Sequence, residues 1–210
     1  MSQKRVRDSA RTKSEILQAA EKEFAQKGFY GARVDGIAEL AEINKRMIYE
    51  YFGNKEGLYR EVLVTVYARL GEQEVQLLTK DLDCLDAIVQ LIHLHFDFLK
   101  ENPNYVSLLL WENLNQGKYF QVDDIKGMRD PALQQIRKVI RKGKMEGVFR
   151  EEVDEDQFLI SLLTFSFPYF SNRYTLSQLL GMPMGLEEDL DKRVEHVTEM
   201  LLMYLLKNPK

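Results

Sequence analysis

The 210-residue sequence contains a single cysteine and no long apolar run, and both scarcities exclude classes of protein. Because Cys84 has no second cysteine to pair with, a disulfide-stabilised secreted domain is excluded, and we expect a reducing, cytoplasmic setting. No apolar stretch reaches the roughly 20 residues of a membrane-spanning helix, and residues 1–13 lack the apolar segment of a signal peptide. We therefore expect no membrane partner. Strand-like alternation, internal repeats and low-complexity tracts are absent as well.

Residues that could hold a metal or perform catalysis are also few. His93, His95 and Asp97 come nearest to a metal-binding pattern. On a helix, residues two apart point to different faces, so only His93 and Asp97 converge, and two ligands are too few for a structural zinc site. No nucleophile–base pair passes the same spacing test. We expect no metal, no cofactor and no catalytic residue.

Charge is distributed unevenly along the chain. The net charge is −4, yet residues 1–60 contain 12 Lys and Arg against 9 Asp and Glu, and the remaining residues contain 17 against 24. A basic arm on an acidic chain indicates a polyanionic partner at one end, with a merely solvated terminus as the alternative. The arm consists of Lys4, Arg5, Arg7, Arg11 and Lys13.

Apolar residues recur at helical spacing almost throughout, as in Ile16, Ala20 and Phe24. The sequence therefore predicts an all-α fold. Thr12 and Glu15 form a capping-box pattern that would open the first helix, and Gly28 would end it. Further helices are expected over residues 35–41, 45–52, 55–79, 83–101, 103–117, 131–145, 154–180 with an interruption at Pro168, and 187–206. Residues 118–129 are expected to be irregular or a broken helix.

The second and third of these helices have the spacing of a helix-turn-helix, whose second helix enters the major groove of DNA by its N-terminal end. Ile37, Ala41, Ile43, Ile48 and Phe52 would supply the shared core. An ordinary αα-hairpin with a solvated face is the alternative. The residues left mostly facing outward are Asn44, Lys45, Arg46, Met47, Tyr49 and Glu50.

These outward residues suit a DNA surface. At the helix N-terminus, Lys45 and Arg46 could reach phosphates or guanine edges. The hydroxyls of Tyr49 and Tyr51 could donate to phosphates, and Lys55, at the start of the next helix, could hold the opposite phosphate strand. We therefore favour double-stranded DNA as the polyanionic partner.

Residues 11–60 contain four stretches that together form a specific pattern: Ile16-Leu17-x-Ala19-Ala20, Phe24-Ala25-x-x-Gly28-Phe29, Val34-x-x-Ile37-Ala38 and Ile48-Tyr49-x-Tyr51-Phe52-x-Asn54-Lys55-Glu56-x-Leu58. Through these stretches, residues 11–60 resemble the DNA-binding domain of the TetR family of bacterial transcriptional regulators. The resemblance implies that Arg33, Lys45, Arg46, Tyr49 and Lys55 are DNA-contact residues. It also implies a three-helix DNA-binding domain over residues 1–58 and a larger helical domain over residues 59–210 that binds a small-molecule effector and forms a homodimer.

Two residues depart from the family pattern. Glu42 occupies the turn where the family commonly has glycine, and a left-handed residue other than glycine costs roughly 1 kcal/mol, so the turn could be reshaped. Glu50 stands where an aromatic or neutral residue is more usual. Its carboxylate would either accept a hydrogen bond from a cytosine amino group or repel phosphate.

The second domain contains a concentration of aromatic residues around Pro168, which we expect to kink its helix. A kinked aromatic helix with a few polar groups could line an effector cavity, with plain core packing as the alternative. The stretches 98–117 and 147–181 weakly resemble a TetR subgroup that includes a pyrimidine-utilisation regulator, and no ligand is carried over from it. The candidate ligand-binding residues are Phe96, Trp111, Tyr119, Phe120, Phe165, Ser166, Tyr169, Asn172 and Arg173.

The last two long helices are expected to form the dimer. Residues 200–206 are apolar on more than one side of the final helix, so they cannot all face one core, and Leu201 and Leu205 are the expected interface residues. The resulting hypothesis is a homodimeric repressor that binds a palindromic operator and responds to a small molecule. The alternatives are a helical protein-interaction module that reuses the scaffold and, less in keeping with the residues, a small-molecule enzyme.

Overall fold

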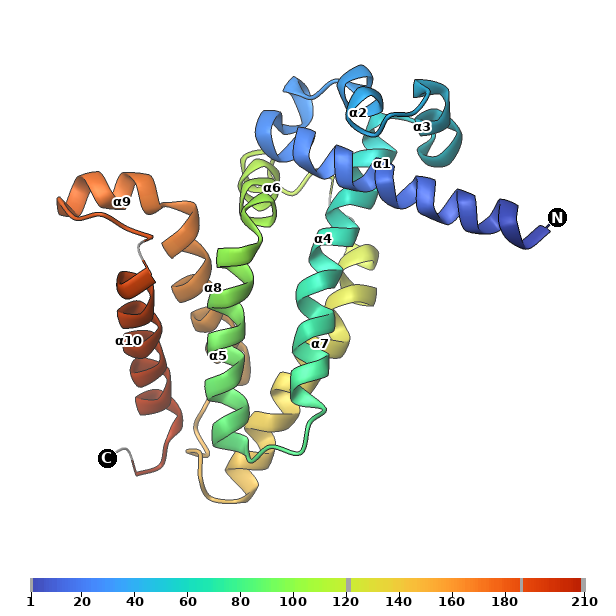
Figure 1. The fold of residues 1–210 in the computed structure, drawn as a ribbon. Helices are drawn as coiled ribbons and strands as arrows, with labels where there is room; N and C mark the ends of the chain where they lie inside the picture. The colour runs from blue at the N-terminus through green and yellow to red at the C-terminus, as the bar shows by residue number, and fades with distance from the viewer. Residues whose placement is uncertain (1, 120–121, 186, 209–210) are drawn as a thin grey trace. The chain divides into compact units, whose positions relative to one another are not determined.

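The computed structural model describes residues 2–119, 122–185 and 187–208, and the side chains of residues 9–119, 127, 129–185 and 187–208. Within these ranges every extended regular element is a helix, which confirms the all-α prediction (Figure 1). None of the described helices is long and apolar enough to cross a membrane. The helices are α1 (Ser2–Gly31), α2 (Val34–Leu40), α3 (Lys45–Phe52), α4 (Lys55–Leu78), α5 (Cys84–Glu101), α6 (Pro103–Leu114), α7 (Val122–Met145), α8 (Glu155–Ser171), α9 (Arg173–Leu180) and α10 (Glu187–Leu205).

The helices group into two compact units. The first contains Met1–Ala68 and Ser107–Lys126, and the second contains Arg69–Val106 and Gly127–Lys210. Helices α4, α6 and α7 each have residues in both units. The segment Ser107–Lys126 thus returns to the N-terminal helices, and no local pattern in the sequence indicates this return.

The core of the first unit is built on α1, α2, α3 and the start of α4. Phe24 packs edge-on against Tyr59, with the two ring centroids 4.8 Å apart, and both residues are buried. Helix α1 begins at Ser2, so the prediction that a capping box at Thr12 opens it is wrong. The residues before Thr12 include neither glycine nor proline, so nothing in them stops the helix. Gly28 does interrupt α1, with φ 64° and ψ 178°.

The second unit has its core between α5, α8 and α10, which pack against one another (Figure 1). Asp83 caps α5 by accepting hydrogen bonds from the Leu85 and Asp86 amides. Along α10, Leu201 and Leu205 are 2% and 0% exposed and belong to this core. The expectation that these two leucines form a dimer interface is therefore wrong, because they already pack within their own unit.

Two helix boundaries differ from the sequence-based expectation. Helix α7 runs through Pro131 and begins at Val122, within a segment that was expected to be irregular or a broken helix. Helix α8 runs through Pro168 to Ser171, and the break comes at Asn172, whose φ and ψ are −107° and 8°. The Asn172 amide still donates to the Pro168 carbonyl at 3.0 Å, so Pro168 does not end the helix.

Candidate functional site

The turn between α2 and α3 retains a left-handed residue without glycine. Glu42 has φ 53°. Its amide donates to the Glu39 carbonyl at 3.1 Å, and the Ile43 amide donates to the Ala38 carbonyl at 3.0 Å. This pair of hydrogen bonds defines a Schellman motif, which satisfies the carbonyls at the end of α2. The turn therefore keeps the geometry that a glycine would allow, at a conformational cost of roughly 1 kcal/mol.

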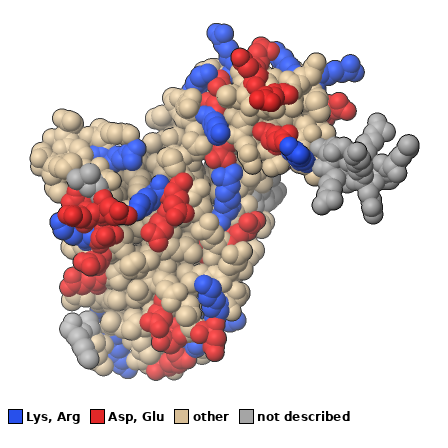
Figure 2. Space-filling view, viewed as in Figure 1, with Lys and Arg blue, Asp and Glu red and all other residues tan. Residues whose placement is uncertain are grey.

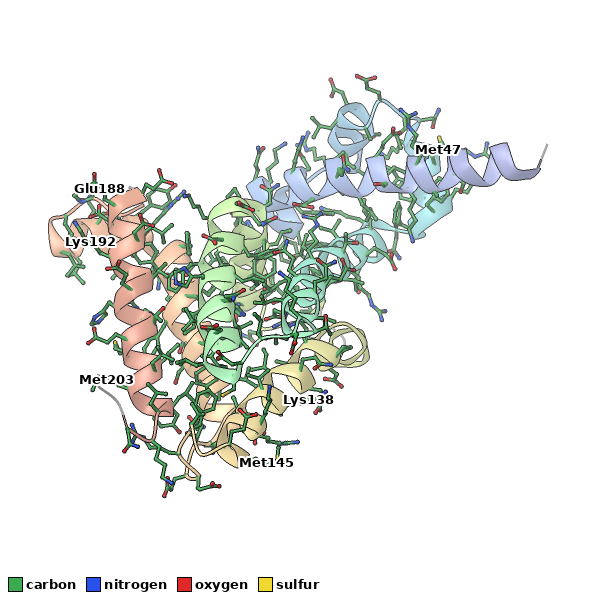
Figure 3. All side chains as sticks on the ribbon, turned by 60° about the horizontal axis from the view of Figure 1, so that its bottom comes forward. Met47, Lys138, Met145, Glu188, Lys192 and Met203 are labelled. Carbon is green, nitrogen blue, oxygen red and sulfur yellow. The ribbon has the colours of Figure 1, made fainter. Side chains whose placement is uncertain are left out.

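Helix α3 buries one side and exposes the other. Ile48 and Phe52 are buried, which fixes the rotation of the helix against α1 and α2. Before the first turn, the Asn44 side chain accepts a hydrogen bond from the Arg46 amide at 2.9 Å. The expected outward residues lie as follows: Asn44, Arg46, Tyr49 and Glu50 are exposed, and Lys45 and Met47 are partly buried, with Met47 marked in Figure 3.

Lys45, at the start of α3, and Arg33, just before α2, differ in their surroundings. Lys45 forms an exposed ion pair with Asp35 of α2 at 2.7 Å, and the hydrogen bond to Asp35 raises the pKa of the lysine. Such exposed pairs contribute little to stability and exchange readily with another anion. Arg33 is exposed just before α2, and its amide donates to the Glu23 carboxylate at 3.2 Å. Both side chains are accessible to a polyanion.

Lys55 and Tyr51 have protein partners. The Lys55 ammonium donates to the Ala32 carbonyl at 2.6 Å and lies 4.9 Å from the centre of the Phe29 ring. Burial lowers the pKa of this lysine. The Tyr51 hydroxyl donates to Ser9 Oγ at 3.2 Å. These contacts favour a packing role for Lys55, and its contact with a phosphate stays a prediction.

Charged side chains of both signs are interspersed over the visible face of the first unit (Figure 2). This face has no continuous basic patch among the residues drawn in colour.

The proposed ligand-binding residues do not form one set. Trp111 and Tyr119 belong to the first unit, where Trp111 Nε1 donates to the Ala25 carbonyl at 3.2 Å and Tyr119 packs on Phe29, ring centres 4.4 Å apart. Phe120 lies outside the described residues. The structure therefore gives Trp111 and Tyr119 structural roles in the first unit.

In the second unit, four of the remaining residues have local roles. Phe96 is buried in the core beside Tyr169, and the buried Ser166 hydroxyl donates to the Leu162 carbonyl at 2.8 Å. Asn172 caps the end of α8, and Arg173 donates to the Tyr174 hydroxyl at 2.7 Å.

Phe165 and Tyr169 do line a cavity, together with Pro168. This groove, which we call the α9 groove, has a volume of about 430 Å³. The aromatic concentration in the sequence thus locates one wall of it. The other lining residues come from α9, the following loop and α10: Leu176, Leu180, Met182, Pro183, Met184, Asp189, Lys192, Arg193 and His196, with Thr164 of α8.

A buried polar cluster in the second unit was not anticipated from the sequence. Glu74 of α4 accepts a hydrogen bond from His95 Nε2 at 2.8 Å and pairs with Arg129 of α7, with Arg129 Nη2 3.1 Å from Glu74 Oε1. All three side chains are buried. The sequence did contain an indication, because His95 falls within the buried stripe of α5. Across the described residues, no group of three or more His, Cys, Asp or Glu side chains is arranged to hold a metal ion.

Two protein-family models match this chain, one near its N-terminus and one in its C-terminal part. Residues 16–62 match the family model described as "Bacterial regulatory proteins, tetR family", and residues 85–201 match "Tetracyclin repressor-like, C-terminal domain". The chain belongs to the TetR family. The chain is therefore a DNA-binding transcriptional regulator.

Individual relatives agree with membership of the TetR family. The "HTH-type transcriptional repressor NicS" of Pseudomonas putida is 33% identical over 182 residues, which cover 86% of each chain. The "HTH-type transcriptional regulator RutR" of Escherichia coli K12 is 26% identical over 203 residues, covering 95% of this chain and 92% of the relative. A TetR family regulator from Marinobacter aquaeolei VT8 has the same fold, with a TM-score of 0.71, 19% identity, and coverage of 99% and 100% of the two chains.

Proposed function

We propose that this TetR-family protein is a homodimeric repressor that binds a palindromic operator and is released by a small-molecule effector. The observation that supports DNA reading is the exposure of Arg46, Tyr49 and Glu50 on one side of α3 while Ile48 and Phe52 anchor the other side. A helix fixed in this way presents a constant set of side chains to a major groove.

The three exposed side chains suit different parts of the groove. Arg46 can donate two parallel hydrogen bonds to a guanine, and Tyr49 can donate one to a phosphate. Glu50 is exposed, so it can accept from a cytosine amino group without first being desolvated. Lys45 can exchange Asp35 for a DNA phosphate at little cost, since the pair is exposed.

Homodimer formation is supported by an apolar face on α8 and α10. These helices pack side by side in the second unit, and their outer surfaces expose Ile160 and Leu163 of α8 with Met200, Met203 and Tyr204 of α10. Exposed apolar side chains on two adjacent helices are suited to a twofold four-helix interface. We call these five residues the α8–α10 face.

Effector response is supported by the α9 groove and by the continuity of α4. Helix α4 starts two residues after α3 ends and continues as one helix from the first unit into the second. A ligand that prefers one arrangement of the second unit would thereby bias the spacing of the two recognition helices in a dimer. By linkage, an effector that weakens operator binding is itself bound more weakly in the presence of operator, by the same factor.

The proposal is tested by selecting duplexes from a randomised DNA library at low salt and measuring their affinities as salt is raised. We expect the selected sequences to be palindromes with half-sites about one helical turn apart, and the logarithm of affinity to fall linearly with the logarithm of salt concentration. The variant Arg46→Ala should lose about 1–3 kcal/mol of preference at one base pair. Failure to bind any duplex at low salt would overturn the assignment.

A further inference from the structure

The α9 groove has the dimensions of a small-molecule site. Its volume of about 430 Å³ falls within the range of roughly 300–1,000 Å³ that is usual for ligand pockets. Phe165 and Tyr169 form the α8 wall, and Leu176 and Leu180 form the α9 wall. The apolar lining, extended by methionines of the loop that follows α9, suits the body of an apolar molecule.

Helix α9 covers this groove only loosely. Of its eight residues, all of them described, none is buried, and Leu179 is 79% exposed. A short helix with so little buried surface opens at a low free-energy cost. The groove is therefore accessible to a ligand, and a ligand that contacts Leu176 and Leu180 would stabilise α9 in place.

Two buried hydrogen-bond donors at the groove, the Tyr169 hydroxyl and Arg193 Nε, lack an acceptor among the described residues. Tyr169 is only 8% exposed, and its hydroxyl oxygen lies near the Gly185 backbone. No acceptor for the hydroxyl proton lies within normal hydrogen-bond geometry among the described residues. The same holds for Nε of Arg193, while the Nη2 of this arginine donates to the Phe165 carbonyl at 3.3 Å. A buried donor left unpaired costs about 1–3 kcal/mol, so this pair of groups favours an acceptor supplied from outside the chain.

The charged residues that line the groove indicate what charge the acceptor should have. Arg193 and Lys192 are both cationic, and Asp189 is the one carboxylate among the lining residues. Burial of the guanidinium lowers the pKa of Arg193. One negative charge would therefore be attracted, and a second negative charge on the same ligand would be repelled by Asp189.

We propose, building on the effector-responsive function above, that the α9 groove binds an apolar monocarboxylate. The carboxylate accepts hydrogen bonds from the Tyr169 hydroxyl and Arg193 Nε, and the apolar body lies between Phe165 and α9. The groove occupies the N-terminal half of α10, around Lys192, whereas the α8–α10 face uses its C-terminal half, around Met203 (Figure 3). A ligand can therefore occupy the groove without replacing a residue of that face.

The test compares three probes of similar length by titration calorimetry on the full chain: octanoate, the neutral 1-octanol and the dicarboxylate suberate. We expect octanoate to bind at least tenfold more tightly than either of the others. Tyr169→Phe and Arg193→Gln should each weaken octanoate binding about tenfold, because each removes one hydrogen bond to a charged group. Arg173→Gln and Tyr174→Phe change the same residue types outside the groove lining and should leave binding unchanged.

Any of three results would overturn the inference. Octanoate does not bind, octanol binds as tightly as octanoate, or the two groove variants bind octanoate as tightly as the wild type. Circular dichroism establishes that the variants fold, and the comparison of the three probes on the unaltered protein needs no variant. Duplex DNA binding is measured separately on the same samples without probe. Loss of operator binding alone refutes the proposed repressor function, whereas failure of carboxylate binding with intact operator binding refutes only the ligand class.

Discussion

Trp111 lies directly against Gly28, at the point where α1 is interrupted. A Cβ atom added to Gly28 would be 2.8 Å from Cδ2 of the indole ring, closer than such atoms approach in proteins. The indole Nε1 donates to the Ala25 carbonyl, three residues before the interruption. Gly28 thus serves two needs at once, because its φ of 64° favours glycine and its missing side chain makes room for the ring.

We expect Gly28→Ala to lower the free energy of unfolding by about 2 kcal/mol, since the strain of a positive φ and the displacement of the indole add together. Trp111 is the chain's one tryptophan, so its fluorescence should shift as well. Gly117→Ala is the matched control, with φ 71° and nothing within 4 Å of the added Cβ. It should cost about 1 kcal/mol without a fluorescence shift. Equal effects of the two substitutions would show that the indole contact is unimportant.

Substitutions of Lys55 and Arg46 should distinguish a role in packing from a role in DNA binding. Lys55→Met removes the hydrogen bond to Ala32 and should lower the free energy of unfolding by about 1 kcal/mol, with little effect on the salt dependence of DNA binding. Arg46→Ala should reduce DNA affinity. It should leave the free energy of unfolding unchanged, because Arg46 is exposed and surface substitutions usually have little effect on stability. Chemical unfolding and binding at several salt concentrations measure the two effects. A salt slope lowered by about one in Lys55→Met would restore Lys55 as a phosphate contact.

Much of the fold follows from local patterns. Asn44 and Gly53 predicted the start and end of α3, and Asp83 predicted the start of α5, because capping depends on residues close in sequence. The end of α7 at Met145 was predicted as well, but its first part, before Pro131, could not be placed in this way. Its passage through Pro131 accompanies the burial of Arg129 against Glu74, a contact across 55 positions that no local pattern contains.

The candidate site residues also differ in whether local sequence patterns predict their positions. The exposure of Arg46, Tyr49 and Glu50 follows from helical spacing against the buried Ile48 and Phe52. The position of Lys55 does not follow, since its partner is the carbonyl of Ala32, 23 residues earlier. Likewise, Trp111 was assigned to a ligand cavity because an isolated tryptophan looks the same in sequence whether it contacts a ligand or a glycine.

The α8–α10 face should be required for dimerisation. Leu163→Glu with Met203→Glu places two charges on this exposed face and should give folded monomers that bind the operator weakly. Leu179→Glu on α9 places the same charge on an exposed apolar residue outside the face and should remain dimeric. Sedimentation velocity at micromolar concentration measures the state of each protein. A double variant that is still dimeric, or a wild type that is monomeric, would contradict the proposed interface.

The Glu74–His95–Arg129 cluster should make stability depend on pH. Burial raises the pKa of Glu74, but the hydrogen bond from His95, together with the positive charge and hydrogen bond of Arg129, outweighs it and holds the pKa below its ordinary value of 4.5. A depressed carboxyl pKa contributes stability above pH 4.5, and this contribution is lost as the pH falls through the folded-state pKa. Tyr105 is close enough to feel both charges, and burial raises its pKa to about 12, so it stays neutral throughout this range.

Substitution of Glu74 isolates this contribution. Glu74→Gln keeps the shape of the side chain but leaves Arg129 buried without a counter-charge, which should cost about 3 kcal/mol at pH 7. Urea unfolding at pH 7 and pH 4 should show a smaller loss of stability on acidification in Glu74→Gln than in the wild type, because the variant has no carboxylate to protonate. Glu72→Gln, an exposed glutamate of the same helix, should behave as the wild type. Identical pH dependence in Glu74→Gln and the wild type would mean that the buried carboxylate keeps an unperturbed pKa despite its hydrogen bonds to His95 and Arg129.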